Sequence, residues 1–402
     1  MSWYNRSANK YCKIKEFQAM PHSSTVLSQI LKLVPRHEFD KLTKQHDGSR
    51  RSDAFNRWTQ FVALSVNHLA GRSSLRDIES TMDSQKHLRY HLGSHSVSRS
   101  ALSRANQTLS PKFFESFFTT LYQRCAKGSA KHKFRFKRKL FSLDASLIDV
   151  SLKVFPNAEY NHMKGAYKLH VGLDHDGLIP AFAAITSGKT GDTQQARLMN
   201  FQKGSVLVFD KGYSSYEWHD SLTDRGIFFV TRIRSNAKYK VIKRQKVNKA
   251  TGVTSDQIIQ YTSIRASKYN LRPVRRVGYY DKETQKHYVF ITNNLRWSAK
   301  TMAEIYKQRW QVELFFKWIK QNLKIKSFIG NSDNAVMTQV LVALCVYLIL
   351  AYLKFQSKLN QSLQQIIRLI QVNIFVKRSL IELFKPPPRE NIKTYQRELW
   401  VC

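Results

Sequence analysis

Apolar and polar residues recur with two different periods along this chain, and the change of period divides it into parts. From Ser23 to about residue 125, apolar residues recur every three or four positions, which predicts amphipathic helices. Two such stripes are formed by Val26, Ile30, Leu31, Leu33 and Val34, and by Phe55, Trp58, Phe61, Val62 and Leu64. After Lys139 apolar residues alternate with polar ones, as is typical of strands. A helical amino-terminal part therefore precedes a strand-rich part.

The strand-rich part begins as a core of strands and helices. Strands are predicted at 140–150, 166–173, 178–186, 206–210 and 227–232, with helices at 193–201 and 214–225. The sequence Asp174-His175-Asp176-Gly177, between the second and third strands, is typical of a hairpin turn. Because strands alternate with helices, we expect a mixed sheet covered by helices, and the fold class is α/β.

A basic, strand-rich insertion interrupts this core. Basic and β-branched residues alternate through four segments, 239–247, 257–264, 272–280 and 288–292. Helical patterns return after Asn293. The predicted organisation is a basic leader at 1–22, a helical part at 23–125, a basic linker at 126–139, a core at 140–235 and 293–384, an insertion at 236–292, and a tail at 385–402.

The stretch from Tyr306 to Lys320 is predicted to be one buried helix. It contains no Gly or Pro, and its apolar side chains surround nearly the whole helix. A narrow polar stripe remains, formed by Tyr306, Arg309, Glu313 and Lys320. Buried charges need partners, and two interpretations are open. In one, Arg309 neutralises Glu313; in the other, Glu313 holds a metal ion and the cations grip phosphates.

The composition is strongly basic, with 66 Lys and Arg against 28 Asp and Glu and a formal net charge of +38. Charge of this size, spread along the whole chain, implies a polyanionic partner, most simply nucleic acid and alternatively an anionic membrane. The apolar run Val340–Leu353 is shorter than the roughly 20 residues that cross a bilayer, so we expect a buried core helix and no membrane partner. Four widely separated cysteines and a polar first segment favour a reducing, cytoplasmic location.

Part of the helical region has features of a DNA reader. A helix starting within 71–79, a turn at 91–95 and a helix at 97–109 resemble a helix-turn-helix unit. The second helix carries Arg99 and Arg104 among several serines. The alternative is an ordinary helical bundle with a basic face.

The basic run 127–139 is predicted to be a linker. Such runs are usually solvated connectors. Phe134 and Phe136 alternate with its cations, so the alternative is that its end enters a strand along the path of the DNA.

Three acidic residues interrupt or end apolar elements. Asp144 lies within one predicted strand, Asp210 ends another, and Glu313 lies on the predicted helix. Open α/β sheets bind ligands at the carboxyl ends of their strands. Carboxylates from three such elements can hold two Mg²⁺ ions, with water and phosphate oxygens completing the coordination. Taken singly, Asp210 could cap a turn and Asp144 could pair with a cation.

Together these residues resemble the bacterial DDE transposases of the insertion-sequence-4 type. The pattern Tyr306-x2-Arg309-x3-Glu313-x6-Lys320 has the spacing of that family's Y-x2-R-x3-E-x6-K signature. Asp210-Lys211-Gly212-Tyr213 lies upstream of it, and residues 22–110 resemble the amino-terminal domain that often precedes this catalytic core.

The chain departs from the family around the first acid. Ala145 follows Asp144, where many relatives have Thr or Ser. Asp149 is therefore an alternative first acid. Because five residues are an odd step along a strand, only one of the two can face the site.

The resemblance implies a ribonuclease-H-like mixed-sheet catalytic core with a β-rich insertion, preceded by an α-helical DNA-binding domain. It makes Asp144, Asp210 and Glu313 catalytic ligands of two Mg²⁺ or Mn²⁺ ions. It makes Tyr306, Arg309, Lys320 and Lys211 contacts with DNA, besides Arg99 and Arg104 in the helical part.

The implied activity is in-line phosphoryl transfer that cuts the ends of an insertion sequence and joins them to target DNA. The implied partner is double-stranded DNA, namely terminal inverted repeats and target, held by a homodimer on paired ends at the bacterial nucleoid. The alternatives are a DNA-binding protein without catalysis and a nuclease that cuts without joining.

Overall fold

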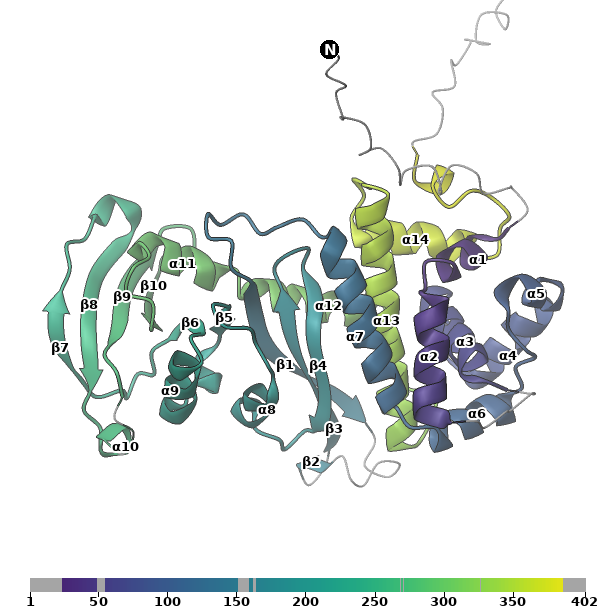
Figure 1. Cartoon of the computed structure of the whole chain (residues 1–402), viewed down its shortest axis with the longest axis horizontal. Helices are drawn as coiled ribbons and strands as arrows, with labels where there is room; N and C mark the ends of the chain where they lie inside the picture. The colour runs from purple at the N-terminus through teal and green to yellow at the C-terminus, as the bar shows by residue number, and fades with distance from the viewer. Residues whose placement is uncertain are drawn as a thin grey trace, which may run out of the picture.

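The computed structural model describes residues 24–48, 55–150, 159–161, 164–267, 269, 271–325 and 327–385. The leader expected at 1–22, and the expected tail apart from Lys385, lie outside the described residues. The protein is elongated, with a twisted sheet at one end and a group of helices at the other (Figure 1).

Within the described residues of the strand-rich part, the strands form one ten-stranded mixed sheet. Its strands are β1 (Leu140–Val150), β2 (Glu159–Asn161), β3 (Lys164–Asp174), β4 (Ile179–Ser187), β5 (Val206–Phe209), β6 (Phe228–Arg232), β7 (Tyr239–Arg244), β8 (Val253–Tyr261), β9 (Val274–Asp281) and β10 (Lys286–Thr292). Their order is β2-β3-β1-β5-β6-β10-β9-β8-β7, and β4 pairs with β3. β1, β5 and β6 are parallel, whereas β3 is antiparallel to both β1 and β4. The predicted α/β class and the predicted hairpin are confirmed.

Residues 236–292, the predicted insertion, carry β7 to β10, and these strands continue the core sheet. β10 pairs with the core strand β6, and β9, β8 and β7 follow outward in antiparallel order. The insertion therefore shares backbone hydrogen bonds with the core.

The helices are α1 (Val26–Leu31), α2 (Arg36–Asp47), α3 (Arg57–Leu69), α4 (Leu75–Ser84), α5 (Arg89–Leu92), α6 (Arg99–Thr108), α7 (Lys112–Gly128), α8 (Asp192–Leu198), α9 (Tyr216–Asp224), α10 (Ile264–Ser267), α11 (Ala299–Lys307), α12 (Trp310–Asn322), α13 (Asp333–Gln356) and α14 (Leu363–Asn373). Several begin where the sequence supplies a cap: Ser74 and Ser98 accept hydrogen bonds from backbone N–H groups in the first turns of α4 and α6.

The amino-terminal helices and the carboxy-terminal helices share one hydrophobic core. Apolar residues from α1, α3 and α7 pack in a single cluster with those of α12, α13 and α14. α1 also meets the segment that follows α14, because the side chain of Gln29 donates to the carbonyl of Arg378 and accepts from the N–H of Leu380. Residues far apart in the sequence thus form one packed unit, with α13 in its middle (Figure 1).

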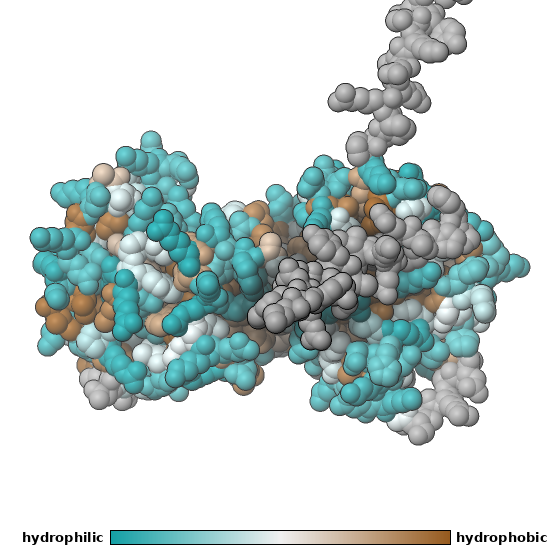
Figure 2. Space-filling model, turned by 45° about the horizontal axis from the view of Figure 1, so that its top comes forward, coloured by the Kyte–Doolittle hydropathy of each residue, from teal (hydrophilic) through white to brown (hydrophobic). Residues whose placement is uncertain are grey.

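α13 is the apolar helix expected from Val340–Leu353, extended at both ends. It is long and apolar enough to span a membrane by length and composition, but 89% of its most apolar window is buried inside the protein. Figure 2 shows one face of the protein as mostly hydrophilic, with hydrophobic residues in separate patches. The prediction of a buried core helix is confirmed.

The prediction of a single helix from Tyr306 to Lys320 is wrong. The chain forms two helices, α11 and α12, which meet at Gln308 and Arg309. The backbone N–H groups of Gln308, Arg309 and Gln311 each bond three residues back, a tighter turn that needs no Gly or Pro. α12 is also not buried on all sides, because Trp310 and Leu314 are 55% and 43% exposed.

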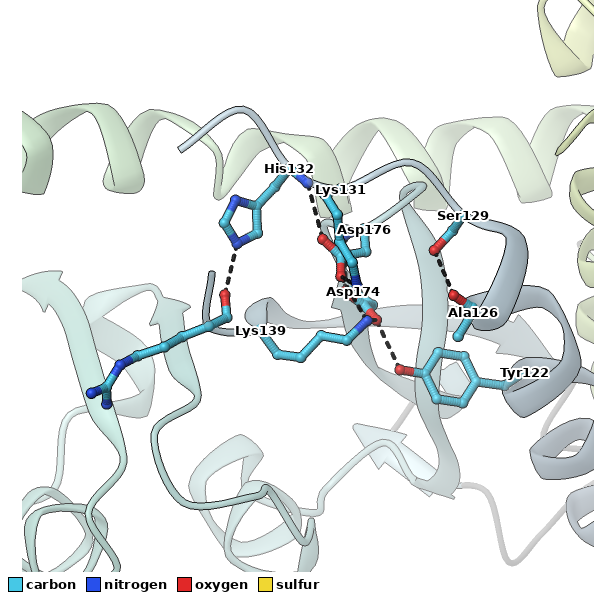
Figure 3. Close-up of polar contacts among 9 residues, drawn as sticks. Tyr122, Ala126, Ser129, Lys131, His132, Lys139, Asp174 and Asp176 are labelled. Atoms are coloured by element: carbon cyan, nitrogen blue, oxygen red, sulfur yellow. Dashed lines mark hydrogen bonds and ion pairs between the residues drawn. The ribbon is translucent and has the colours of Figure 1, made fainter. Parts of the chain in front are cut away.

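The basic linker is anchored to the end of the β3–β4 hairpin (Figure 3). Lys139 Nζ lies 2.6 Å from a carboxylate oxygen of Asp174 and 2.8 Å from one of Asp176, and Lys131 pairs with Asp176. Tyr122, on α7, donates to Asp174. Although burial opposes ionisation, these cations and the N–H of His132 lower the pKa of Asp176 to about 2. The linker is therefore held in place and is not a free connector.

The two aromatic residues of the linker pack against the insertion side of the sheet. The rings of Phe134 and Phe136 stack on each other, and Phe136 stacks on Trp297 with 4.8 Å between centroids. Neither residue lies in a strand, but the end of the linker leads directly into β1 at Leu140.

Candidate active site

The sheet register brings two of the predicted acids side by side. In the parallel β1–β5 pair, Leu143 is opposite Phe209, so the next residues along the two strands are Asp144 and Asp210. β5 ends at Phe209, whereas β1 continues past Asp144 to Val150, so Asp210 follows the carboxyl end of β5. This is the edge at which open α/β sheets bind their ligands.

α12 brings Glu313 to the same place, and Arg309 links it to β1. Arg309 Nη2 lies 2.5 Å from Glu313 Oε1, and Nη1 lies 3.7 Å from Asp144 Oδ2. The side chain of Arg309 is 15% exposed, that of Asp144 23% and that of Glu313 34%. Two of the three acids therefore share one half-buried guanidinium.

Tyr306 serves the third acid. Its hydroxyl, on α11, donates to Asp210 Oδ1 over 3.2 Å. Burial and the neighbouring Asp210 raise the pKa of Tyr306 to about 12, so it remains a hydrogen-bond donor at neutral pH. The break between α11 and α12 thus places Tyr306, which contacts Asp210, and Glu313, which shares Arg309 with Asp144, on separate helices.

Burial raises the pKa of Asp144 to about 6. The N–H of Ala145 and the charge of Arg309 act in the opposite direction, while Glu313 and Asp192 add to the rise. The hydrogen bond from Ala145 and the charge of Arg309 therefore do not compensate for the effect of burial on the carboxyl of Asp144. Asp149, the alternative first acid, is exposed on the outer part of β1 opposite Ala166.

The remaining predicted DNA contacts differ in their distance from this group. Lys320 Nζ donates to Ser146 Oγ over 2.6 Å and to the carbonyl of Leu147 over 2.8 Å, which ties α12 to β1. Lys211 is exposed directly after Asp210. Arg99 and Arg104 are exposed on α6, in the helical part.

Sequence reasoning missed a fourth acid near the site. Asp192, the first residue of α8, acts on the pKa of Asp144 and of Tyr213. Its carboxylate pairs with Lys168 at 3.1 Å and lies 3.9 Å from Nδ1 of the buried His170. Only its position at a predicted helix start could have indicated it.

A second missed feature holds the junction of the two helices. Ser142 Oγ, on β1, lies 2.6 Å from Nε2 of His175 and 3.4 Å from the carbonyl of Gln308. Both side chains are buried. The junction that presents Arg309 is therefore fixed directly to the strand that carries Asp144.

A divalent metal ion fits the donor chemistry of the site but not its present arrangement. Among the described residues, no three His, Cys, Asp or Glu side chains form a ready metal site. Carboxylate oxygens are nevertheless the donors that Mg²⁺ and Mn²⁺ prefer. The raised pKa of Asp144 indicates a carboxylate that a cation would stabilise. The acids could hold such an ion once Arg309 moves away from them.

A carboxylate within one strand, a second at the end of the neighbouring strand and a third acid on a helix define this protein as an α/β protein with a polycarboxylate site. Residues 135–349 match the family described as "Transposase DDE domain". The chain therefore belongs to the DDE transposase family, as the sequence predicted. Residues 22–95 match a separate domain of unknown function, DUF4372.

Several proteins named as transposases are similar to this chain. The chain is 36% identical to y4zB of Sinorhizobium fredii over 230 residues. This matched region covers 55% of this chain and 63% of that protein. It is 29% identical to a protein of Geobacillus stearothermophilus named for insertion sequence element IS5377, over 57% of this chain and 60% of that protein. It is 22% identical to one of Synechocystis named for element IS4SA, over 73% and 82%. The chain thus spans less than two thirds of the length of the first two relatives.

One solved structure is similar over most of the chain. It is the piggyBac transposase synaptic complex with hairpin DNA, with a TM-score of 0.45 and 11% identity, covering 92% of this chain and 84% of that one.

Proposed function

We propose that this protein is a transposase that binds the terminal inverted repeats of an insertion sequence and catalyses metal-dependent cleavage and strand transfer. Two observations carry the proposal: Asp144 and Asp210 directly follow paired residues of β1 and β5, and Arg309 contacts both Asp144 and Glu313. A protein that only binds DNA has no need for three carboxylates at that edge, since they repel phosphate.

We further infer that β1, β3, β4, β5 and β6 form the ribonuclease-H-like core that the family resemblance implies. The support is their order, β4-β3-β1-β5-β6, in which three parallel strands are followed by an antiparallel pair at one side. In this assignment, β7 to β10 are the insertion between the core and the helix that carries Glu313. The insertion-sequence-4 type also stays a prediction, supported by the spacing of the signature.

Asp144, Asp210 and Glu313 would hold the two divalent ions. Such ions supply a nucleophile at neutral pH and stabilise the leaving oxygen during in-line displacement. Arg309 neutralises two of the acids and so stands where a cation is needed. We propose that it changes partners, from carboxylates to a DNA phosphate, when DNA and metal bind together.

The two open interpretations of the polar stripe thereby become two states of one residue. In the free protein Arg309 is the counter-ion of Glu313, and the hydrogen bond from its guanidinium to Glu313 Oε1 supports this role. In the DNA complex it grips phosphate, while Tyr306 holds Asp210 in place. Lys320 ties α12 to β1 in the free protein, so its proposed contact with DNA requires a similar exchange.

DNA binding is proposed to extend over the basic surface. Lys211 lies next to the acids, and Arg99 and Arg104 are exposed on α6, where they could reach bases or phosphates of the terminal repeat. A homodimer on paired ends follows from the proposed function alone.

The test is a cleavage and joining assay on supercoiled plasmid that carries the element's terminal repeats, with Mg²⁺ or Mn²⁺. We expect cutting at the repeats followed by insertion into a target plasmid. Asp144→Ala, Asp210→Ala and Glu313→Ala should each abolish cutting while DNA binding stays within a few fold, because the positive charge elsewhere supplies the affinity. Cutting without insertion would indicate a nuclease, and binding alone would indicate a protein without catalysis. Full activity of Asp144→Ala with loss in Asp149→Ala would move the first acid to Asp149.

A further inference from the structure

The helical amino-terminal part contacts the far end of the helix that carries Glu313. α3 is buried along its whole length and shares a core with α12, α13 and α14. The family that matches residues 22–95 has no assigned function. The contact between α3 and α12 gives a physical basis for one.

His68, in the last turn of α3, makes this contact. It is fully buried, and its ring lies between two backbone carbonyls: Nδ1 is 2.8 Å from the oxygen of Leu323, and Nε2 is 3.1 Å from that of Gln339. Leu323 is the C-cap of α12, and Gln339 belongs to α13. Carbonyl groups at a helix end lack partners within the helix, so a donor from α3 satisfies one of them.

Only one of these two contacts can be a hydrogen bond at neutral pH. Burial lowers the pKa of His68 to about 4, so the ring is neutral and carries a single N–H. The shorter distance assigns this proton to Nδ1, which donates to Leu323. The bond from α3 therefore ends on the helix that carries Glu313.

A second bond fixes the turn that follows α12. Lys324 Nζ donates to the carbonyl of Gly71, just after α3, over 2.6 Å. Lys324 has a φ of +49°, a left-handed conformation that is unfavourable for a residue with a side chain and so requires support from its surroundings. The helical part thus holds the end of α12 at two successive residues.

We propose that His68 is a positioning residue for catalysis, and that the amino-terminal helical part is a brace that fixes α12 against β1. This inference rests on the proposed function. α12 is about 20 Å long, so a small rotation at Leu323 moves Glu313, near the other end, relative to Asp144 and Asp210. A misplacement of about 1 Å can cost roughly 100-fold in rate.

The experiment compares side chains that keep or lose the donor at the Nδ1 position in the full chain. His68→Asn places an amide N–H two bonds from Cβ, as Nδ1 is, whereas His68→Leu has no donor. Lys324→Asn tolerates the left-handed backbone but cannot reach Gly71. Thr59→Val is the matched control, because it removes a buried acceptor of the His95 N–H elsewhere on α3.

Two readouts separate positioning from simple loss of stability. In His68→Leu we expect kcat of cleavage to fall roughly 10- to 100-fold with the KM for DNA unchanged, and a higher metal concentration for half-maximal rate. We also expect faster hydrogen exchange in the last turn of α12. His68→Asn should restore most of the rate and the exchange protection, and Lys324→Asn should show a smaller loss of both. Thr59→Val should change melting but neither readout.

The inference is overturned if His68→Leu cleaves at the normal rate, or if Asn is as poor as Leu while Thr59→Val is equally slow. Should His68→Leu fail to fold, Lys324→Asn decides the matter, and unchanged exchange in α12 would refute the brace. Absence of cleavage in the unaltered protein would refute the proposed function, and the exchange measurements would still test the brace.

Discussion

The helical amino-terminal part and the β-rich insertion both join the core sheet, but different forces join them. The helices are attached through side-chain packing, in one hydrophobic cluster that reaches from α1 to α14. The insertion is attached through backbone hydrogen bonds from β10 to β6, and it contains a buried ion pair between Arg275 and Asp256. The first attachment is non-directional and depends on volume, whereas the second depends on register and charge.

The largest effect is expected from breaking the packing side of this comparison. Phe61 is fully buried on α3, with the rings of Phe39, Trp58 and Phe117 within 5.6 Å of its own, centroid to centroid. Phe61→Ala should lower the free energy of unfolding by about 3–5 kcal/mol, as measured by urea denaturation. Hydrogen exchange should accelerate in α13 as well as in α3. Protection that persists in α13 would mean that the helical part is an independent domain. Tyr90→Ala, at a 90% exposed position, is the control.

A similar or slightly smaller effect is expected from the insertion. Arg275 and Asp256 are both 5% exposed, with a bidentate contact of 2.8 and 2.6 Å. Arg275→Ala strands a buried carboxylate, which should cost about 3–5 kcal/mol. Exchange should accelerate in β8 and β9 while α13 stays protected. Arg272→Ala removes the exposed pair with Asp224 and should cost less than about 1 kcal/mol. If both variants lost the same free energy of unfolding, the buried Arg275–Asp256 pair would contribute no more to stability than the exposed pair, and the prediction would be wrong.

A smaller effect is expected at the site between the two regions. The pKa of Asp144 is raised to about 6 by burial, so the folded state binds its proton more tightly than the unfolded state does. Stability from this group is therefore present at low pH and lost as pH rises through about 6. Asp144→Asn should raise the free energy of unfolding by about 1–3 kcal/mol at pH 7 without metal and flatten the pH dependence between about 4 and 6. Mg²⁺ should stabilise the unaltered protein more than the variant. Thermal melting at several pH values, with and without Mg²⁺, measures both effects. A variant that is less stable than the unaltered protein at pH 7 without metal would contradict the prediction.

The smallest effects sharpen the comparison on DNA. Arg99→Ala or Arg104→Ala, on α6, should reduce discrimination between terminal-repeat and random DNA by about 1–3 kcal/mol if these side chains read bases. Lys240→Gln or Lys243→Gln, on the exposed strand β7, should weaken both DNAs equally and reduce the salt slope by about 1. Binding titrations at several salt concentrations distinguish the two. Equal weakening by the α6 variants would make Arg99 and Arg104 phosphate contacts.

The elements could be predicted from the sequence because their patterns are local. β1 begins and ends where the alternation of apolar residues predicts, and the fully apolar run at 206–209 is a strand buried on both faces. What these elements pack against could not be predicted. A hydrophobic stripe indicates that a helix face is buried, but it does not indicate which element buries it. α3 and α13 pack together although they are more than 250 residues apart in the sequence.

The candidate site could be predicted only where the spacing of residues or the end of a strand indicates a site residue. Fixed spacing indicated Tyr306, Arg309 and Glu313, and strand ends indicated Asp210. The turn that separates α11 from α12 was missed, because it depends on a shift from four-residue to three-residue hydrogen bonds that no residue type announces. Asp192 and His68 were missed for a similar reason: each acts through a partner that only the fold brings near.

β7 also affects the tendency of this protein to aggregate at high concentration. It is the last strand of the sheet, and its outer edge offers unpaired backbone groups to any other extended chain. Lys240, Lys243 and Arg244 are exposed along it. Cations on an edge strand repel a second copy of the same edge, so they hinder the stacking of sheets into aggregates. The cations with which β7 is proposed to hold a polyanion would thereby also keep the protein from polymerising with itself.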